Sequence, residues 1–378
     1  MKNVFVSQIQ ERDWVDAAFL VRDKIVGMAK NGKPYLTLKL MDRSGEVEGR
    51  IWDRVDELTP QFERDDFVRV AGKASIYMGK MQLVIQELAR LDDKVVDLAD
   101  FLPVAARPVA EMVADLKARV AAMTDVNLRT LLQAFLADEA FLEAYSRAPA
   151  AKAMHHVYLG GLLEHSLAVA ALAEDICLRY PGLNRDLLVA GALLHDVGKV
   201  NELRYARSFE YTDAGKLLGH IVIGVEMVEE KLRSIPGFPR EMAILLKHLL
   251  LSHHGQYEYG SPKRPKTLEA VILNFIDDLD SKINGVRTHL DKEPDSESSW
   301  TQYHRFYDRY FFKGFGEMPG VAETVEITLA PKAAEASAAV RSERPAPRSP
   351  QFNNILEEKL KGMTPNLFSA PPAERDNE

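Results

Sequence analysis

Short runs in which apolar and polar residues alternate fill the first quarter of the chain. An alternation of period two places successive side chains on opposite faces of a β-strand, and turn residues such as Asn31-Gly32 and Ser44-Gly45 separate the runs. The pattern predicts strands at residues 17–28, 35–41, 45–52, 66–77 and 81–88. Five short strands in so small a segment favour an OB-fold barrel, and we assign residues 1–100 to this N-terminal all-β domain.

The second predicted strand carries leucines on one face, and Leu36, Leu38 and Leu40 are expected inside the barrel. The opposite surface of this strand and the next combines aromatic rings with cations, at Tyr35, Lys39, Arg50 and Trp52. Rings beside cations are typical of proteins that bind single-stranded nucleic acid by base stacking and phosphate contacts. Packing against a neighbouring domain is the alternative interpretation, because OB barrels serve several ligand classes.

The pattern changes to helical spacing after Phe101-Leu102-Pro103. One apolar stripe with this spacing runs through Val109, Met112, Val113, Leu116 and Val120. Further helices are expected near residues 161–180, 184–196, 219–235, 240–252 and 267–285. We therefore assign residues 101–322 to an all-α domain. Residues 323–378 are rich in Ala, Pro, Ser, Arg and Glu and are expected to form a disordered tail with a short amphipathic piece at 352–363.

Composition favours a cytoplasmic protein without a membrane partner. Apolar residues make up 46% and charged residues 28% of the chain, and no uncharged run reaches the roughly eighteen residues of a membrane span. The N-terminus lacks the apolar run of an export signal. Cys177 is the single cysteine and is expected to have a structural role. The net charge of −8 argues against coating of nucleic acid by bulk electrostatics, although it is compatible with a local basic groove.

Histidines and aspartates of the metal-binding type are spread over the helical part of the chain. His195 and Asp196 end the apolar run 187–194, where an unpaired charge would be costly and a bound cation would remove that cost. The candidate ligands are His165, His195, Asp196, His220, His253, His254 and Asp277. Together they could hold two divalent cations, since a carboxylate can bridge two ions. The chemistry indicated is metal-assisted hydrolysis of a phosphate ester.

Spacing along the helices ranks some of these candidates. Asp277 and Asp280 share one side of a predicted helix, so we expect Asp277 to be the ligand and Asp280 to support it or face the substrate. Asp278 is rotated away and is expected in solvent. His253 and His254 point about 100° apart, so one can bind metal while the other faces the phosphate, and the sequence does not rank them.

Charged residues near this set are candidates for substrate contacts. Lys199 lies one helical turn beyond His195 and is expected to act with Asp196 in catalysis by holding a phosphate oxygen. Balance of the helix dipole is the alternative role for Lys199. Further candidates for substrate contacts are Lys152, Arg264 and Lys266, and the pair His155 and His156, for which helix packing is the alternative.

The order His165, His195-Asp196 and Asp277 resembles that of the HD-domain phosphohydrolase superfamily, and the added His220 and His253-His254 are similar to its binuclear branch. Three segments make the resemblance more specific, namely Gly160–Ser166, Leu194–Lys199 and Leu251–Gly255. Preceded by an OB barrel, they resemble the YhaM-type 3′→5′ exoribonucleases, and this resemblance covers about residues 4–315.

The resemblance implies that His165, His195, Asp196 and Asp277 surround one ion, while Asp196, His220 and one of His253 and His254 surround the other. A donor set this rich in imidazole favours Mn²⁺, Co²⁺, Fe²⁺ or Ni²⁺ over Mg²⁺. The resemblance also implies release of 5′-nucleoside monophosphates from the 3′ end of single-stranded RNA. The sequence leaves open whether single-stranded DNA is a further partner and whether the chain forms an oligomer.

Two other hypotheses remain open at this point. The same type of metal centre can serve a phosphodiesterase or phosphohydrolase that acts on a cyclic dinucleotide or a free nucleotide. The second hypothesis is a regulatory nucleic-acid-binding protein with a purely structural metal site. The number of candidate ligands, however, exceeds what one closed structural site needs.

Overall fold

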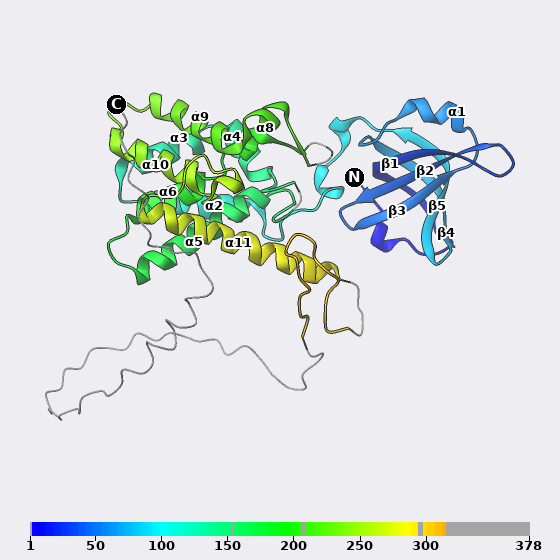
Figure 1. Cartoon of the computed structure of the whole chain (residues 1–378). Coiled ribbons are helices and arrows are strands. Elements are labelled where there is room, and N and C mark those ends of the chain that lie inside the picture. The colour runs from blue at the N-terminus through cyan, green and yellow to red at the C-terminus, as the bar shows by residue number, and fades with distance from the viewer. Residues whose placement is uncertain (1, 153, 206, 208, 294–297, 315–378) are drawn as a thin grey trace, which may run out of the picture. The chain divides into compact units, whose positions relative to one another are not determined.

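The computed structural model describes residues 2–152, 154–205, 207, 209–293 and 298–314 (Figure 1). A β-barrel is followed along the chain by a helical domain, which confirms the predicted fold class. The predicted tail at 323–378, with its amphipathic piece at 352–363, lies outside the described residues, and the domain boundaries stay a prediction. No helix in the described part of the chain combines the length and apolarity needed to cross a membrane.

The barrel closes in the strand order β1-β2-β3-β5-β4. Its strands are β1 (Trp14–Met28), β2 (Pro34–Asp42), β3 (Gly45–Ile51), β4 (Phe67–Tyr77) and β5 (Lys80–Arg90). Neighbouring strands are antiparallel except β3 and β5, which pair in parallel, and the short α1 (Val55–Leu58) follows β3. All five predicted strands are confirmed, and β1 begins three residues earlier than predicted.

The inside of the barrel is filled by the residues that the alternation assigned to it. Leu36, Leu38 and Leu40 are fully buried, and they belong to one cluster with Phe19 of β1 and Val68 of β4. Burial of each such side chain contributes roughly 1.5 to 3 kcal/mol, so this core specifies the register of β2 between its two partners. The opposite face of β2 and β3 is thereby fixed toward the outside.

The helical domain consists of α2 (Val109–Ala121), α3 (Val126–Leu136), α4 (Glu139–Arg147), α5 (Gly161–Arg179), α6 (Arg185–Leu194), α7 (Lys199–Glu202), α8 (Asp213–Leu217), α9 (Gly219–Arg233), α10 (Arg240–Ser252) and α11 (Leu268–Lys292). Side chains cap several helix starts. Asp125, Asp138, Asn184 and Thr267 each accept a hydrogen bond from a backbone N–H of the first turn. The predicted helices are confirmed, but α6 ends two residues earlier and α11 ends seven residues later than expected.

Several short elements were not predicted from the sequence, including a two-stranded sheet between α7 and α8. β6 (Leu203–Arg204) and β7 (Glu210–Tyr211) pair as a small antiparallel hairpin. Single 3₁₀ turns form at Val6–Gln8, Thr59–Gln61, Asp93–Val95, Leu98–Asp100 and Tyr257–Tyr259. These pieces are too short for a periodic pattern to reveal them.

The core of the helical domain is built around α5 and α6. The run 187–194 is apolar on all sides, and every residue of α6 from Asp186 to Leu194 is buried. α5 contacts α2, α4, α6 and α11, while α10 and α11 cover α6. This packing buries His165 on α5 and directs the turn that follows α6 into the interior of the domain.

Candidate metal centre

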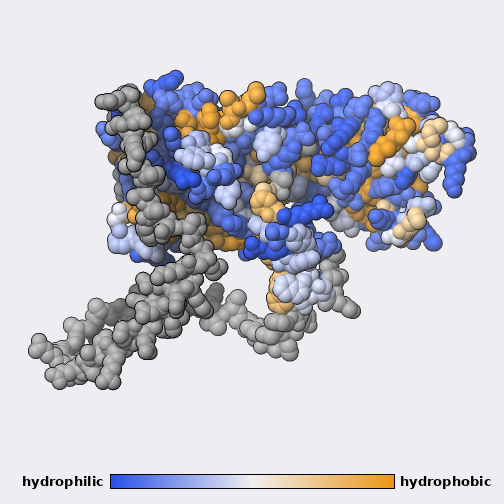
Figure 2. Space-filling view, viewed as in Figure 1, coloured by the Kyte–Doolittle hydropathy of each residue, from blue (hydrophilic) through white to orange (hydrophobic). Residues whose placement is uncertain are grey.

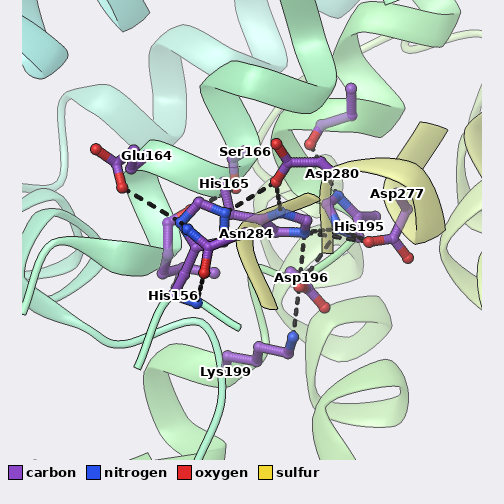
Figure 3. A network of polar contacts seen from close by, with 12 residues as sticks. His156, Glu164, His165, Ser166, His195, Asp196, Lys199, Asp277, Asp280 and Asn284 are labelled. Atoms are coloured by element: carbon purple, nitrogen blue, oxygen red, sulfur yellow. Dashed lines mark hydrogen bonds and ion pairs between the residues drawn. The ribbon is translucent and has the colours of Figure 1, made fainter. Parts of the chain in front are cut away.

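Four side chains from distant parts of the helical domain meet at one point, namely His165 of α5, His195 and Asp196 of the turn after α6, and Asp277 of α11 (Figure 3). The Nε2 atoms of His165 and His195 are 3.2 Å apart. Asp277 Oδ1 lies 3.1 Å from His165 Nε2, and Asp196 Oδ2 lies 3.3 Å from His195 Nε2. Donor atoms about 2.1 Å from a shared ion are separated by roughly 3 to 3.5 Å, so these side chains have the spacing of metal ligands.

A second group forms on the other side of Asp196. Its Oδ1 atom lies 3.3 Å from His220 Nε2 and 3.7 Å from His253 Nε2. Ligand atoms of His220, His253 and His254 all lie within 4.8 Å of one another. The two oxygens of Asp196 therefore face two different groups of donors, which is the arrangement required of a bridging carboxylate. Both members of the His253-His254 doublet belong to the second group.

All five histidines are oriented by hydrogen bonds from Nδ1. The acceptors are Asp280 Oδ2 for His165 (2.7 Å), the Ala192 carbonyl for His195 (2.9 Å), Glu202 Oε1 for His220 (3.1 Å), the Leu250 carbonyl for His253 (2.7 Å) and the Tyr259 carbonyl for His254 (2.8 Å). An oxygen acceptor places the hydrogen on Nδ1 of a neutral ring, so Nε2 keeps its lone pair. This outer support is the usual arrangement around histidines that bind metal.

Several buried atoms in this centre have no hydrogen-bond partner in the described part of the chain. They include Asp196 Oδ1, His220 Nε2 and His253 Nε2, the atoms that define the second group. An unsatisfied buried polar atom costs about 1 to 3 kcal/mol, and native structures rarely keep three of them together without a ligand. The donor types, their spacing and these unsatisfied atoms therefore fit a pair of divalent cations.

Electrostatics keep the two carboxylates of the first group charged. Burial acts to raise the pKa of Asp196, but the Lys199 ammonium and the His195 ring hold that pKa well below its usual value. Burial opposes ionisation of Asp277 too, while hydrogen bonds from His165 and His195 keep its pKa well below the usual range. Burial also acts to lower the pKa of His195, yet Asp196 and Asp277 raise it to about 10. A cation can use His195 only after this ring has lost its proton.

Lys199 stands at the edge of the first group. Its ammonium donates to Asp196 Oδ2 at 2.6 Å, and the side chain is largely buried. α6 ends at Leu194, so Lys199 begins a separate helix, α7, and does not continue the helix before His195. Gly198 permits this turn to pack closely, because a Cβ atom there would lie 2.0 Å from the His220 carbonyl oxygen.

A further layer of polar groups lies behind His165. Asp280 Oδ2 accepts from His165 and, at 2.9 Å, from His156 Nε2, while His156 Nδ1 lies 3.3 Å from Glu164 (Figure 3). The structure thus places Asp280 in the supporting position expected from the sequence. Asp278 is exposed and bonded to Lys282 at 2.6 Å. His156, for which two roles were open, joins the support of the metal centre.

Two further polar residues, His155 and Glu202, lie beside the metal-binding groups. His155 has a buried Nδ1 atom without a partner in the described residues, and its ring centroid lies 5.2 Å from that of His165. Glu202 is a candidate that the sequence did not reveal, and it accepts hydrogen bonds from the ring and the backbone N–H of His220 at 3.1 and 2.9 Å. A glutamate so close to His195-Asp196 was the only sequence signal for it.

Comparison with known proteins identifies the family. Sequence models match in both domains, as an HD domain over residues 162–282 and an OB-fold nucleic acid binding domain over residues 19–91, and a third model, described as a putative helicase, matches residues 102–181. The second OB-fold domain of replication protein A from Methanococcus maripaludis aligns with 24% of this chain and 95% of its own, with a TM-score of 0.21 and 15% identity.

Two relatives match nearly their whole length. The 3′-5′ exoribonuclease YhaM of Geobacillus sp. (strain WCH70) is 37% identical over 300 residues, which are 79% of this chain and 91% of that protein. The YhaM protein of Bacillus subtilis (strain 168) is 37% identical over 294 residues, which are 77% of this chain and 91% of that protein. The chain belongs to the YhaM 3′-5′ exoribonuclease family. The family resemblance predicted from the sequence is thereby confirmed.

In this member of the YhaM family, the predicted nucleic-acid face lies on the outside of β2 and β3. The rings of Tyr35 and Trp52 are 5.1 Å apart, and the Arg50 guanidinium lies 5.3 Å from the Tyr35 ring centre. Arg50 is also bonded to Glu48 at 2.7 Å, and Lys39 to Glu46 at 2.6 Å. The rings and cations are thus brought together, but acidic partners reduce the net charge of this face.

An open groove of about 780 Å³ adjoins the same strands. Thr37, Lys39 and Arg50 line it, and so do two residues of the β4–β5 turn that sequence reasoning passed over, Tyr77 and Lys80. The signal was available, because an aromatic ring and a cation flank the turn glycine in Tyr77–Lys80. A stacking ring and a cation at a loop beside the groove suit a single strand.

The remaining predicted contacts of this YhaM-family chain lie on the surface of the helical domain. Lys152 is exposed, with its ammonium 5.7 Å from the ring centre of Tyr211. Arg264 is exposed as well, with its guanidinium 5.0 Å from the ring centre of Tyr257. Lys266, two residues beyond Arg264, is also exposed. Their contact with a substrate stays a prediction.

Proposed function

We propose that the protein is a metal-dependent 3′→5′ exoribonuclease that hydrolyses single-stranded RNA to 5′-nucleoside monophosphates. The observation that carries this proposal is the position of Asp196, whose two oxygens face two groups of imidazole nitrogens. Membership of the YhaM family supports the same reaction. The OB barrel supports a polymer as the substrate, because its outer face offers rings and cations to a single strand.

The first ion would be held by His165, His195, Asp196 and Asp277. The second would be held by Asp196 together with His220, His253 and His254. When bound, two divalent cations would lower the pKa of a water molecule, polarise the phosphodiester and stabilise the departing 3′ oxygen. The preponderance of imidazole donors favours Mn²⁺, Co²⁺, Fe²⁺ or Ni²⁺ over Mg²⁺, and Mn²⁺ is the ion that we propose.

The chain's own residues would position the substrate around these ligands. Lys199 presents an ammonium at the edge of the first group, where it can neutralise a non-bridging phosphate oxygen while it keeps Asp196 ionised. His155 Nδ1, which is buried without a partner in the described residues, can hydrogen-bond to the terminal nucleotide. Tyr35 and Trp52 would stack on upstream bases and hold the strand between successive cleavages.

The polarity of cleavage is tested with two labels on the same single-stranded RNA, in the presence of Mn²⁺. A 5′ label should remain on a product that shortens stepwise, and a 3′ label should appear first as a mononucleotide. Asp196→Asn should abolish hydrolysis, because the amide cannot bridge two cations, whereas Asp278→Asn on the exposed side of α11 should not. RNA that stays intact with Mn²⁺ and the wild-type chain would overturn the proposal, and turnover of a cyclic dinucleotide instead would favour the small-substrate alternative.

The role of the barrel is tested with a matched pair of tryptophans. Trp52→Ala removes a ring from the predicted nucleic-acid face, and Trp14→Ala removes a ring of similar exposure from β1. Loss of one stacked base costs about 1 to 3 kcal/mol, so Trp52→Ala should weaken binding of a long RNA by about fivefold to 150-fold. The Trp14 variant should bind as the wild type does. Equal binding by both variants would place the RNA elsewhere.

A further inference from the structure

Hydrophobic residues gather in a few patches on an otherwise hydrophilic surface (Figure 2), and one set of them belongs to α11. The buried side of this helix carries Leu273 and Ile276 and packs on α5, α6 and α10. The adjacent side of the helix is also apolar, and four of its residues are exposed. Leu268, Phe275, Leu279 and Ile283 are 62%, 67%, 46% and 47% exposed. Exposed apolar rows of this length on a soluble domain mark a surface that another element covers.

Seven apolar positions on this side are symmetric about Leu279. They are Leu268, Ile272, Phe275, Leu279, Ile283, Val286 and Leu290, of which Ile272, Val286 and Leu290 are half-buried and Ile272 also packs on the core of the domain, while the exposed Val271 lies outside the set. The intervals between them are four, three, four, four, three and four residues, so they are the same in both directions from the centre. At 100° per residue all seven lie within an arc of about 80°, and they form one continuous stripe along the helix. We call these seven residues the α11 stripe.

We propose that the α11 stripe is the interface of a homodimer, in which two copies of α11 pack antiparallel with a twofold axis at Leu279. A twofold interface must be complementary to itself, and reversal of the stripe places apolar positions on apolar positions over the whole helix. Phe275 then faces Ile283 of the second copy, and Leu279 faces its own equivalent. Intervals of three and four residues are those of helices that pack side by side.

The charges beside the stripe agree with a second copy of the chain. Asp278 and Lys282 lie on one edge of it and are bonded at 2.6 Å. In the antiparallel pair Asp278 of one copy is offset by two residues, about 3 Å along the helix axis, from both Lys282 and Asp278 of the other, so the two aspartates and two lysines form one mixed cluster in which each lysine can pair with either carboxylate. An RNA is a poorer occupant, because Lys282 is the cation beside this part of the stripe and it is already paired with a carboxylate.

A second set of exposed rings extends the surface beyond the helix. Residues 299–313 form a hairpin that is joined to the C-terminal half of α11, where the rings of His289 and His304 are 4.5 Å apart. Trp300, Phe306 and Tyr310 of this hairpin are more than half exposed. An antiparallel pair brings this half of α11 beside the N-terminal half of the other, so the hairpin adds area toward the roughly 800 Å² per partner of a standard interface.

The solution mass of the full chain tests the proposal independently of the proposed activity. Sedimentation equilibrium at micromolar concentration should give a dimer for the wild type and a monomer for Leu279→Glu. The matched control is Leu178→Glu on α5, where the leucine is 85% exposed, and it should stay dimeric. Far-UV circular dichroism checks that both variants are folded. A monomeric wild type, or a Leu279→Glu protein that is still dimeric, would overturn the proposal.

The register is tested by cross-linking, which the single native cysteine makes simple. In a Cys177→Ser background, Leu279→Cys should form a disulfide-linked dimer under mild oxidation. Phe275→Cys and Ile283→Cys should each cross-link poorly alone and several times better when the two chains are mixed. Equal yields alone and mixed would overturn the antiparallel arrangement. A wild type that becomes dimeric only after removal of residues 316–378 would instead show that this segment covers the stripe, which would also overturn the proposal for the full chain.

Discussion

Replacement of Asp280 by asparagine separates the support of the metal centre from its ligands. Asp280 Oδ2 accepts hydrogen bonds from His165 at 2.7 Å and from His156 at 2.9 Å. Asparagine keeps the size of the side chain and one acceptor oxygen but removes the negative charge. His165 would then be held less firmly, with Nε2 still directed at the first ion.

The magnitude follows from the two hydrogen bonds. A bond to a charged acceptor contributes about 1.5 to 3 kcal/mol and a neutral one about 0.5 to 1.5 kcal/mol, so each bond loses roughly 1 kcal/mol. Two such losses amount to about 2 kcal/mol, or about a thirtyfold weaker affinity for the metal of the first group. This value lies within the tenfold to hundredfold range that is usual for outer partners of metal-binding histidines.

Titration of metal-free protein with Mn²⁺ measures this change, and the rate of RNA hydrolysis as a function of Mn²⁺ concentration gives a second readout. Asp280→Asn should need about thirtyfold more Mn²⁺ and should recover its rate at excess metal. Asp278→Asn is the matched control, because it makes the same chemical change on the exposed side of the same helix. The reasoning would be refuted if both variants bound Mn²⁺ as the wild type does, or if both were weakened equally.

Two further predictions concern the turn between α6 and α7. Gly198→Ala should lower the free energy of unfolding by about 3 kcal/mol, because its Cβ would meet the backbone of α9 at 2.0 Å, and chemical denaturation would measure this. Metal affinity should rise with pH. The pKa of His195 is raised to about 10 in the metal-free fold, so this ring is protonated at neutral pH and each cation bound there releases a proton. Affinity should therefore increase up to tenfold per pH unit below that value, and calorimetry in two buffers of different ionisation enthalpy should show the released proton. Identical heats in both buffers would contradict this assignment.

The elements that the sequence predicted well are those with a clear period. Alternation located every strand of the barrel, and the three-to-four spacing located the long helices, because each of these patterns records one buried face. The predicted end of α11 was wrong, and the structure shows the reason. The predicted range ended at Gly285, but this glycine is a point of close approach within the helix, since a Cβ there would lie 2.5 Å from the Tyr307 hydroxyl, and the helix continues to Lys292.

The candidate site could be predicted in its residue types but not in its atoms. The sequence indicated which histidines and aspartates are candidates, because polar residues at the ends of buried apolar runs need a partner. It could not show that Asp196 faces two groups, since that depends on the packing of α9 and α10 against the turn after α6. Glu202 was missed for the same reason, because its burial depends on a short helix without a periodic pattern.

The same local structure appears twice in the centre and explains how a buried set of donors is held in place. His195 and His253 are the residues that directly follow α6 and α10. Each donates from Nδ1 to the carbonyl three residues earlier, that of Ala192 or Leu250. The last carbonyls of a helix lack partners within it, so this bond satisfies a free acceptor and fixes the ring with Nε2 inward at the same time. A histidine immediately after a buried apolar helix is thus more than a residue of the right type, because the helix end itself determines which nitrogen is offered to the metal.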